Sequence, residues 1–217
     1  MSRIWAPLLA LCLFAACGED EETIVEYPDW QATNEQAFHE VMDYARSQVD
    51  AGLTGEWKVF LNWSLENQTA ATGGFIEDYG EDYHIAVQVL EQGTGSGCPM
   101  YTDSVLVHYR LRLLPSTSYE EGRVIDESYT GEFNELTAQP KKMYVGGTVD
   151  GFATALMRMH IGDRWMVYVP YRLGYGTTES SNIPAYSMLR FDIKLAGYYR
   201  ANHVSRAGEP KGEWIME

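Results

Sequence analysis

The chain contains 217 residues, of which 45% are hydrophobic and 13% aromatic. This composition excludes a disordered chain, which lacks the apolar side chains that a packed core needs. Acidic residues outnumber basic ones by 31 to 16, and the formal charge of −15 argues against binding to nucleic acid or anionic lipid, which both select basic surfaces. The 3 cysteines are too few for a disulfide-rich scaffold. The length allows one domain with an appendage, or two small domains.

The first residues are typical of a secretory signal peptide. Arg3 provides the positive charge, and the apolar run Ile4–Ala16 is shorter than the ~20 residues that a membrane-spanning helix needs. The sequence LFAAC at 13–17 resembles the lipobox of bacterial lipoproteins, in which the cysteine is lipidated and becomes the first residue after cleavage. The resemblance implies a lipoprotein signal peptide over 1–16 and a membrane anchor on Cys17. The alternative is an ordinary signal peptide with a chance cysteine.

An acidic block at 19–22 follows this cysteine. Mutual repulsion predicts that it stays extended and solvated, so we interpret 17–32 as an acidic linker. The block also resembles the export signal of surface lipoproteins in Bacteroidetes-like bacteria. We therefore expect an outer-membrane lipoprotein of the bacterial cell envelope, and the sequence leaves open whether it is periplasmic or surface-exposed. Loss of the leader leaves Cys98, which has no basic sequence neighbours, and we expect an inert thiol and no disulfide.

A helix is predicted over about 33–50. Thr33 and Gln36 fit a capping box, apolar residues follow at helical spacing, and Gly52 offers a C-terminal stop. Residues 57–65 fit either a strand or a helix, and 66–82 are predicted to form a loop or boundary. Together, 33–82 are predicted to form a helical N-terminal extension packed on the main domain.

From residue 84 the pattern changes to alternating apolar and polar residues, which predicts antiparallel strands with one solvated face. Four such runs begin at Ile85, Val105, Trp165 and Leu189. A helical segment at about 151–159 interrupts them, so the expected fold class is α+β, with the helix covering the apolar face of the sheet. This domain is predicted to span 83–200, followed by a C-terminal tail at 201–217.

The histidines and the glycine-rich run do not have the spacing of a metal site or a nucleotide-binding site. The 5 histidines are scattered singly, and none lies at metal-ligand spacing from a second ligand. His108 is next to Tyr109 on a predicted strand and is expected to face solvent. The glycine-rich run at 93–97 lacks the lysine and the following helix of a phosphate-binding loop, and we interpret it as a turn. We expect no metal and no cofactor.

The later motifs, in their order and spacing, resemble the FKBP family of peptidyl-prolyl cis-trans isomerases over about 84–198, and in particular lipoprotein FKBPs of Bacteroidetes. These motifs are VHY at 107–109, VIDES at 124–128, VDGF at 149–152, GDR at 162–164, VP at 169–170, GYG at 174–176, IP at 183–184 and LRFD at 189–192. The resemblance implies a five- or six-stranded antiparallel sheet wrapped around a short helix.

The same resemblance implies an enzyme that isomerises X–Pro bonds in proline-containing polypeptides and assists the folding of exported proteins. The alternative is a non-catalytic FKBP-like chaperone or peptide-binding module in a surface lipoprotein complex. A third hypothesis is an accessory subunit that docks through the helix at 33–50. We expect a monomer.

The resemblance also implies a shallow apolar pocket. Its catalytic residues would be Tyr109, Asp126, Phe152, Tyr175 and Phe191, and its further substrate-binding residues would be Ile125, Val149 and Ile183. Phe152 would form the floor beneath the proline ring, Tyr175 would donate a hydrogen bond to the substrate backbone, and Asp126 would lie at the rim. Ile125 and Phe152 replace the aromatic residue and the tryptophan that are common in the family, and the segment around Lys142 has no clear aromatic counterpart.

Overall fold

The computed structural model of the protein describes residues 25–66, 79–201 and 212–217. The predicted signal peptide, Cys17, the acidic block and most of the predicted loop at 66–82 lie outside these ranges. Within the ranges described, no helix is both long enough and apolar enough to cross a membrane.

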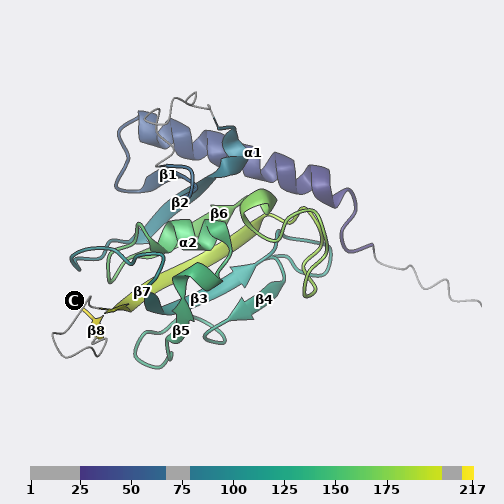
Figure 1. Ribbon diagram of the computed structural model, residues 1–217. Helices are drawn as coiled ribbons and strands as arrows, with labels where there is room; N and C mark the ends of the chain where they lie inside the picture. The colour runs from purple at the N-terminus through teal and green to yellow at the C-terminus, as the bar shows by residue number, and fades with distance from the viewer. Residues whose placement is uncertain (1–24, 67–78, 202–211) are drawn as a thin grey trace, which may run out of the picture.

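The described chain forms one antiparallel sheet with two α-helices against it (Figure 1). In chain order the elements are α1 (Trp30–Asp50), β1 (Trp57–Leu61), the 3-10 helix η2 (Glu81–Tyr83), β2 (His84–Glu91), β3 (Ser104–Arg112), β4 (Val124–Glu127), β5 (Lys141–Tyr144), η3 (Val145–Gly147), α2 (Asp150–Leu156), β6 (Arg164–Val169), η4 (Tyr171–Leu173), β7 (Leu189–Ala201) and β8 (Gly212–Ile215). The strand order is β1-β2-β6-β7-β3-β4, with β5 paired to β3 and β8 paired to β7.

The inner face of the sheet packs on α2, as the alternation of apolar residues predicts. Tyr109 and Leu111 of β3 and Phe191 and Ile193 of β7 alternate with polar residues and are buried. The helix comes so close to β6 that a Cβ added at Gly151 would lie 2.3 Å from Cγ1 of Val169. The predicted α+β architecture, a sheet wrapped around a short helix, is therefore confirmed.

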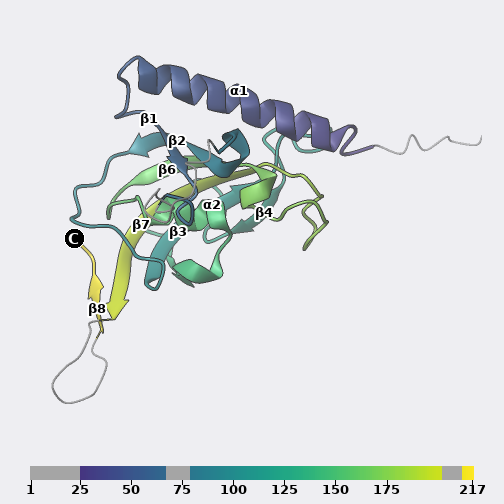
Figure 2. The same cartoon turned by 45° about the horizontal axis from the view of Figure 1, so that its top comes forward.

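Helix α1 lies along the β1–β2 end of the sheet (Figure 2) and contributes Phe38 and Met42 to the same core. The predicted capping box is wrong. The helix begins at Trp30, so Thr33 lies within it, and its N-cap residue Asp29 makes no side-chain capping bond. Burial of Trp30 against the sheet domain extends the helix by one turn beyond the point that the local capping pattern indicated.

The C-terminal end of α1 follows the prediction. Gly52 has a φ of 83°, a left-handed conformation that glycine adopts without steric penalty. The N–H of Leu53 donates to the carbonyl of Gln48 and the N–H of Gly52 donates to that of Val49, both at 2.9 Å. These two bonds form a Schellman motif, which satisfies carbonyl groups that the helix leaves free.

Strands also form in one segment whose secondary structure the sequence left undecided and in one segment that was predicted to be a tail. The ambiguous segment at 57–65 contains β1, which pairs with β2 and joins the predicted extension at 33–82 to the sheet. The predicted tail at 201–217 contains β8, which pairs with β7. Strands β4 and β5 are four residues long and partly or fully exposed, so they carry too little alternation to be recognised by period.

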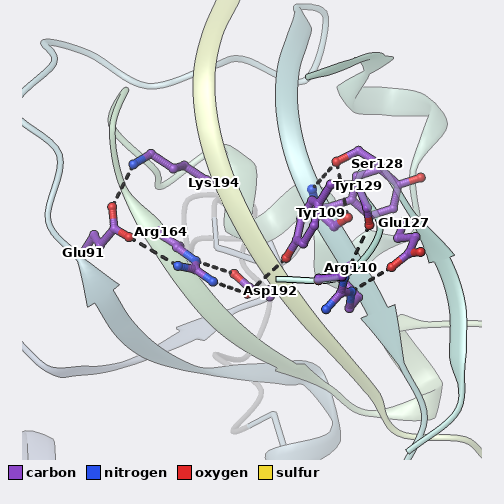
Figure 3. Close-up of polar contacts among 10 residues, drawn as sticks. Glu91, Tyr109, Arg110, Glu127, Ser128, Tyr129, Arg164, Asp192 and Lys194 are labelled. Carbon is purple, nitrogen blue, oxygen red and sulfur yellow. Dashed lines mark hydrogen bonds and ion pairs between the residues drawn. The ribbon is translucent and has the colours of Figure 1, made fainter. Parts of the chain in front are cut away.

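The outer face of the central strands carries a ladder of charges (Figure 3). Arg164 binds Asp192 with Nη2 at 2.7 Å, and Lys194 binds Glu91 at 2.7 Å. The expectation that the His108 side chain faces solvent on this side is wrong, because His108 is only 3% exposed. The ring of Phe133 lies 5.1 Å from it, so the loop between β4 and β5 covers a position that strand alternation alone assigns to water.

Candidate peptide-binding pocket

A cavity of about 300 Å³ is lined by residues of α2 and of the strands β3, β4, β5 and β7. The side chains and backbone that line it come from six different parts of the chain. They are Tyr109, Leu111, Asp126, Met143, Gly147, Thr148, Val149, Phe152, Tyr175 and Phe191. Most of this lining is apolar, as expected for a site that binds an apolar group through burial.

Three aromatic rings form the floor of the pocket. Phe152 lies on the first turn of α2, and its ring centroid is 4.8 Å from that of Phe191 and 6.0 Å from that of Tyr109. Both pairs are in the edge-to-face arrangement that aromatic quadrupoles favour. Each of the three residues is at most 4% exposed, so the floor is rigid and dry.

One rim of the pocket carries a connected polar group. The hydroxyl of Tyr109 donates a short hydrogen bond to Oδ2 of Asp126, and Nζ of Lys141 donates to the same hydroxyl at 2.7 Å. Lys141 also lies 3.4 Å from Oδ2 of Asp126. Burial, followed by the hydrogen bond to Asp126, raises the pKa of Tyr109 well above its usual range. Because its one proton is committed to Asp126, Tyr109 has no donor left for a ligand.

A second tyrosine hydroxyl of the pocket is free. Tyr175 lines the pocket, is 39% exposed, and its hydroxyl makes no hydrogen bond within the described part of the chain. Burial, and then the nearby Asp126 carboxylate, raise the pKa of Tyr175, so the group stays protonated at neutral pH. The pocket therefore has one available side-chain O–H donor facing its apolar floor.

The structure brings six of the eight predicted pocket residues together. Tyr109, Asp126, Val149, Phe152, Tyr175 and Phe191 all line the cavity. Ile125 and Ile183 are not among the lining residues. Ile183 is 1% exposed and belongs to the core, and Ile125 is partly buried against that core. The roles that the resemblance implies for all eight remain predictions.

Sequence reasoning missed Leu111, Gly147, Thr148 and the rim residue Lys141, and it indicated Met143 only as part of a wall segment around Lys142 and Met143 that lacks a clear aromatic counterpart. Leu111 could have been predicted from the sequence, because alternate residues of a strand share a face and Tyr109 lies two positions earlier. The other four depend on where the loop before α2 and the short strand β5 lie in space. No local pattern indicates that arrangement.

The environment of Cys98 also differs from its sequence context. Although it has no basic neighbours in sequence, Nε2 of His160 lies 3.8 Å from its Sγ, and Arg200 donates to its carbonyl oxygen at 2.7 Å. Burial, and then the Asp163 carboxylate, raise the pKa of the thiol against the smaller opposing effect of Arg200. Among the residues described, no group of three or more His, Cys, Asp or Glu side chains is placed to hold a metal ion.

A sheet wrapped around a short helix, with an aromatic-lined pocket beside that helix, defines a domain whose site has the shape and lining to accept one apolar group. The sequence model of one family, FKBP-type peptidyl-prolyl cis-trans isomerase, matches residues 95–196. A relative described as FKBP-type 22 kDa peptidyl-prolyl cis-trans isomerase, from Escherichia coli (strain K12), is 32% identical over 161 residues, which cover 73% of this chain and 67% of the relative. The chain belongs to this family.

Other similar proteins match over shorter shares of their length. Macrophage infectivity potentiator of Trypanosoma cruzi is 33% identical over 112 residues, 51% of each chain. The crystal structure of FkpA from Escherichia coli aligns with a TM-score of 0.47 at 22% identity, covering 76% of this chain and 59% of that one. The chain thus spans about half to two thirds of the relatives named here.

Proposed function

We propose that the protein catalyses the cis-trans isomerisation of X–Pro bonds in polypeptide substrates. The observation that carries this proposal is the pocket itself. Phe152, Phe191 and the Tyr109 ring offer an apolar floor to a cavity of about 300 Å³, large enough for a proline ring, and Tyr175 offers a free donor in the same cavity. Membership of the isomerase family supports the same reaction.

The pocket is suited to this reaction without covalent chemistry. The X–Pro bond is planar because its nitrogen shares a lone pair with the carbonyl, which gives a barrier of ~18–20 kcal/mol. Twisting the bond removes that resonance and leaves a less polar carbonyl. An apolar floor disfavours the polar planar state relative to the twisted one, while a hydrogen bond from Tyr175 holds the peptide backbone. The site then binds the transition state better than the ground state, which is the condition for catalysis.

A proline-limited reaction tests the activity directly. A soluble fragment of residues 23–217 at micromolar concentration should accelerate cis-to-trans conversion of an X–Pro tetrapeptide, which without catalyst takes roughly 10–100 s. No acceleration, together with suppression of aggregation of an unfolded client, would instead favour the non-catalytic chaperone alternative.

We further propose that Cys17 carries a lipid anchor that holds the domain at a bacterial membrane, where it acts on exported polypeptides. The lipobox-like sequence and the acidic linker after it support this proposal, and two acyl chains provide stable attachment. Expression of the full chain with labelled palmitate should label the wild type and leave Cys17→Ser unlabelled. Equal labelling of both would refute the anchor, and protease treatment of intact cells would distinguish a surface from a periplasmic location.

A further inference from the structure

The pocket wall that carries Tyr175 belongs to a loop that α1 supports. This loop runs from η4 to β7 and covers 174–188, and Figure 1 shows it in yellow-green beside the N-terminal half of α1. Its two ends are joined near the pocket, because the N–H of Tyr186 donates to the carbonyl of Gly176 at 3.0 Å. The rings of Tyr171 and Tyr186 also meet, with centroids 5.1 Å apart. The position of Tyr175 therefore depends on where the Tyr186 end of the loop is held.

That end is bound by two residues from the first turn of α1. Nε1 of Trp30 donates to Oγ of Ser187 at 2.8 Å. The N–H of Met188 donates to Oδ1 of Asn34 at 2.7 Å. Nδ2 of the same amide donates to the carbonyl of Trp30 at 2.7 Å, which fixes the orientation of the Asn34 side chain. The helix and the loop are more than 150 positions apart in sequence.

These contacts are buried, and burial makes them favour a single position of the 174–188 loop. Asn34 is 1% exposed and Ser187 and Met188 are each 3% exposed. A buried backbone N–H without an acceptor carries a larger energetic cost than a formed bond returns, so Met188 N strongly favours the loop position that meets Asn34. The loop also holds Tyr186 at a φ of 62°, a conformation that a non-glycine residue keeps only when its surroundings impose it.

We propose that Asn34 and Trp30 are positioning residues of the peptide-binding pocket. They hold the 174–188 loop, and through the Tyr186–Gly176 bond they hold Tyr175 in the conformation that binds substrate. Without them, a peptide must order the loop as it binds, which weakens affinity and leaves the bound complex unchanged. The test by KM rests on the proposed isomerase function. The test by amide exchange of the loop does not depend on that function.

The test compares Asn34→Leu and Trp30→Phe with the wild type, each in the full-length protein. The first variant removes the acceptor for Met188 N at similar volume, and the second removes the Nε1 donor together with part of the buried indole ring. Asn34→Leu is expected to raise KM for a proline tetrapeptide about tenfold with kcat nearly unchanged, and to speed amide exchange at Gly176, Tyr186 and Met188 by a similar factor. Trp30→Phe should shift both quantities in the same direction by a smaller factor.

Met42→Ala is the matched control. Met42 is fully buried on the same helix but does not contact the loop through any of these bonds, so the variant lowers stability without removing the contacts to Ser187 and Met188. It should leave KM and loop exchange near wild type. Equal effects of Met42→Ala and Asn34→Leu, or wild-type loop exchange in Asn34→Leu, would overturn the proposal. If the wild type itself lacks isomerase activity, the proposed function fails, and the exchange comparison still decides the role of Asn34.

Discussion

Two tyrosine hydroxyls face the pocket, and their hydrogen bonds give them different roles. That of Tyr109 is bound on both sides, by Asp126 as acceptor and by Lys141 as donor. That of Tyr175 is free within the described part of the chain. The first organises the rim, and the second is the group that we propose donates to a peptide carbonyl. The family resemblance already implied the donor role of Tyr175, and the structure adds that the Tyr109 hydroxyl is engaged by Asp126 and Lys141.

Removing the free hydroxyl should therefore impair activity without harming the fold. We expect Tyr175→Phe to lower kcat/KM for a proline tetrapeptide about fivefold, because a hydrogen bond to bound substrate contributes about 1 kcal/mol. The urea midpoint of unfolding should stay near wild type, since this hydroxyl has no hydrogen-bond partner among the described residues. Tyr119→Phe, an exposed tyrosine far from the pocket lining, serves as the control. Equal activity of both variants would remove Tyr175 from the site.

His39 gives stability a pH dependence. Its Nδ1 lies 2.6 Å from Oε2 of Glu81, and this hydrogen bond raises the pKa of His39 above its usual 6.5. A raised pKa means that the contribution to stability is complete below about pH 6.5 and is lost as pH rises through the higher folded-state value. Because the side chain is 52% exposed, the effect is screened and amounts to a few tenths of a kcal/mol.

Urea unfolding of wild type and His39→Gln at pH 5.5 and pH 8.5 measures this contribution. The wild type should be slightly more stable than the variant at the lower pH and equal to it at the higher pH. A difference that grows towards alkaline pH would contradict the assigned ion pair.

At the scale of elements, the end of α1 depends on a single glycine. An alanine at Gly52 meets no neighbouring atom within 4 Å, so the whole effect of Gly52→Ala comes from the positive φ. We expect the free energy of unfolding to fall by about 1 kcal/mol. Gly55→Ala also has open space around it and no positive φ, so it should be neutral or slightly stabilising. Similar urea midpoints for the two variants would argue against the Schellman motif.

The elements that sequence predicted well are those with a strong period. The long strands β2, β3, β6 and β7 and the helices α1 and α2 each repeat apolar residues often enough to show which face is buried. β4, β5 and β8 do not, because each is only four residues long, and each forms only because a longer neighbour offers backbone partners. Pairing is a property of two segments, and it cannot be read from one of them.

The pocket residues also divide into those that the sequence predicted and those that depend on tertiary structure. The aromatic floor comes from two strands and a helix that the sequence predicts, and the family resemblance implied that Tyr109, Phe152 and Phe191 share one site. Lys141 and Met143 enter through β5, which pairs with β3, and this placement depends on tertiary structure. The support of the 174–188 loop by Asn34 was equally hidden, because helix periodicity gives no reason to bury an asparagine.

At the scale of the whole molecule, α1 and β1 belong to the same core as the strands that follow. Phe38 and Met42 are at most 2% exposed, and burial of each such side chain contributes roughly 1.5–3 kcal/mol. A fragment of residues 83–217 should therefore be less stable than 23–217 by at least about 3 kcal/mol. Urea unfolding monitored by tryptophan fluorescence measures the difference, and equal midpoints would show that the N-terminal segment is dispensable.

The position of β7 sets the order in which the protein can be completed during synthesis. This strand is the next to last in the described chain, yet it alone joins β6 to β3 in the centre of the sheet. Until the ribosome has released it, one half of the sheet ends at β6, the other begins at β3, and α2 has no closed surface to pack on. Long-range pairing of this kind is slow to form. The domain is therefore expected to stay open until β7 has been made.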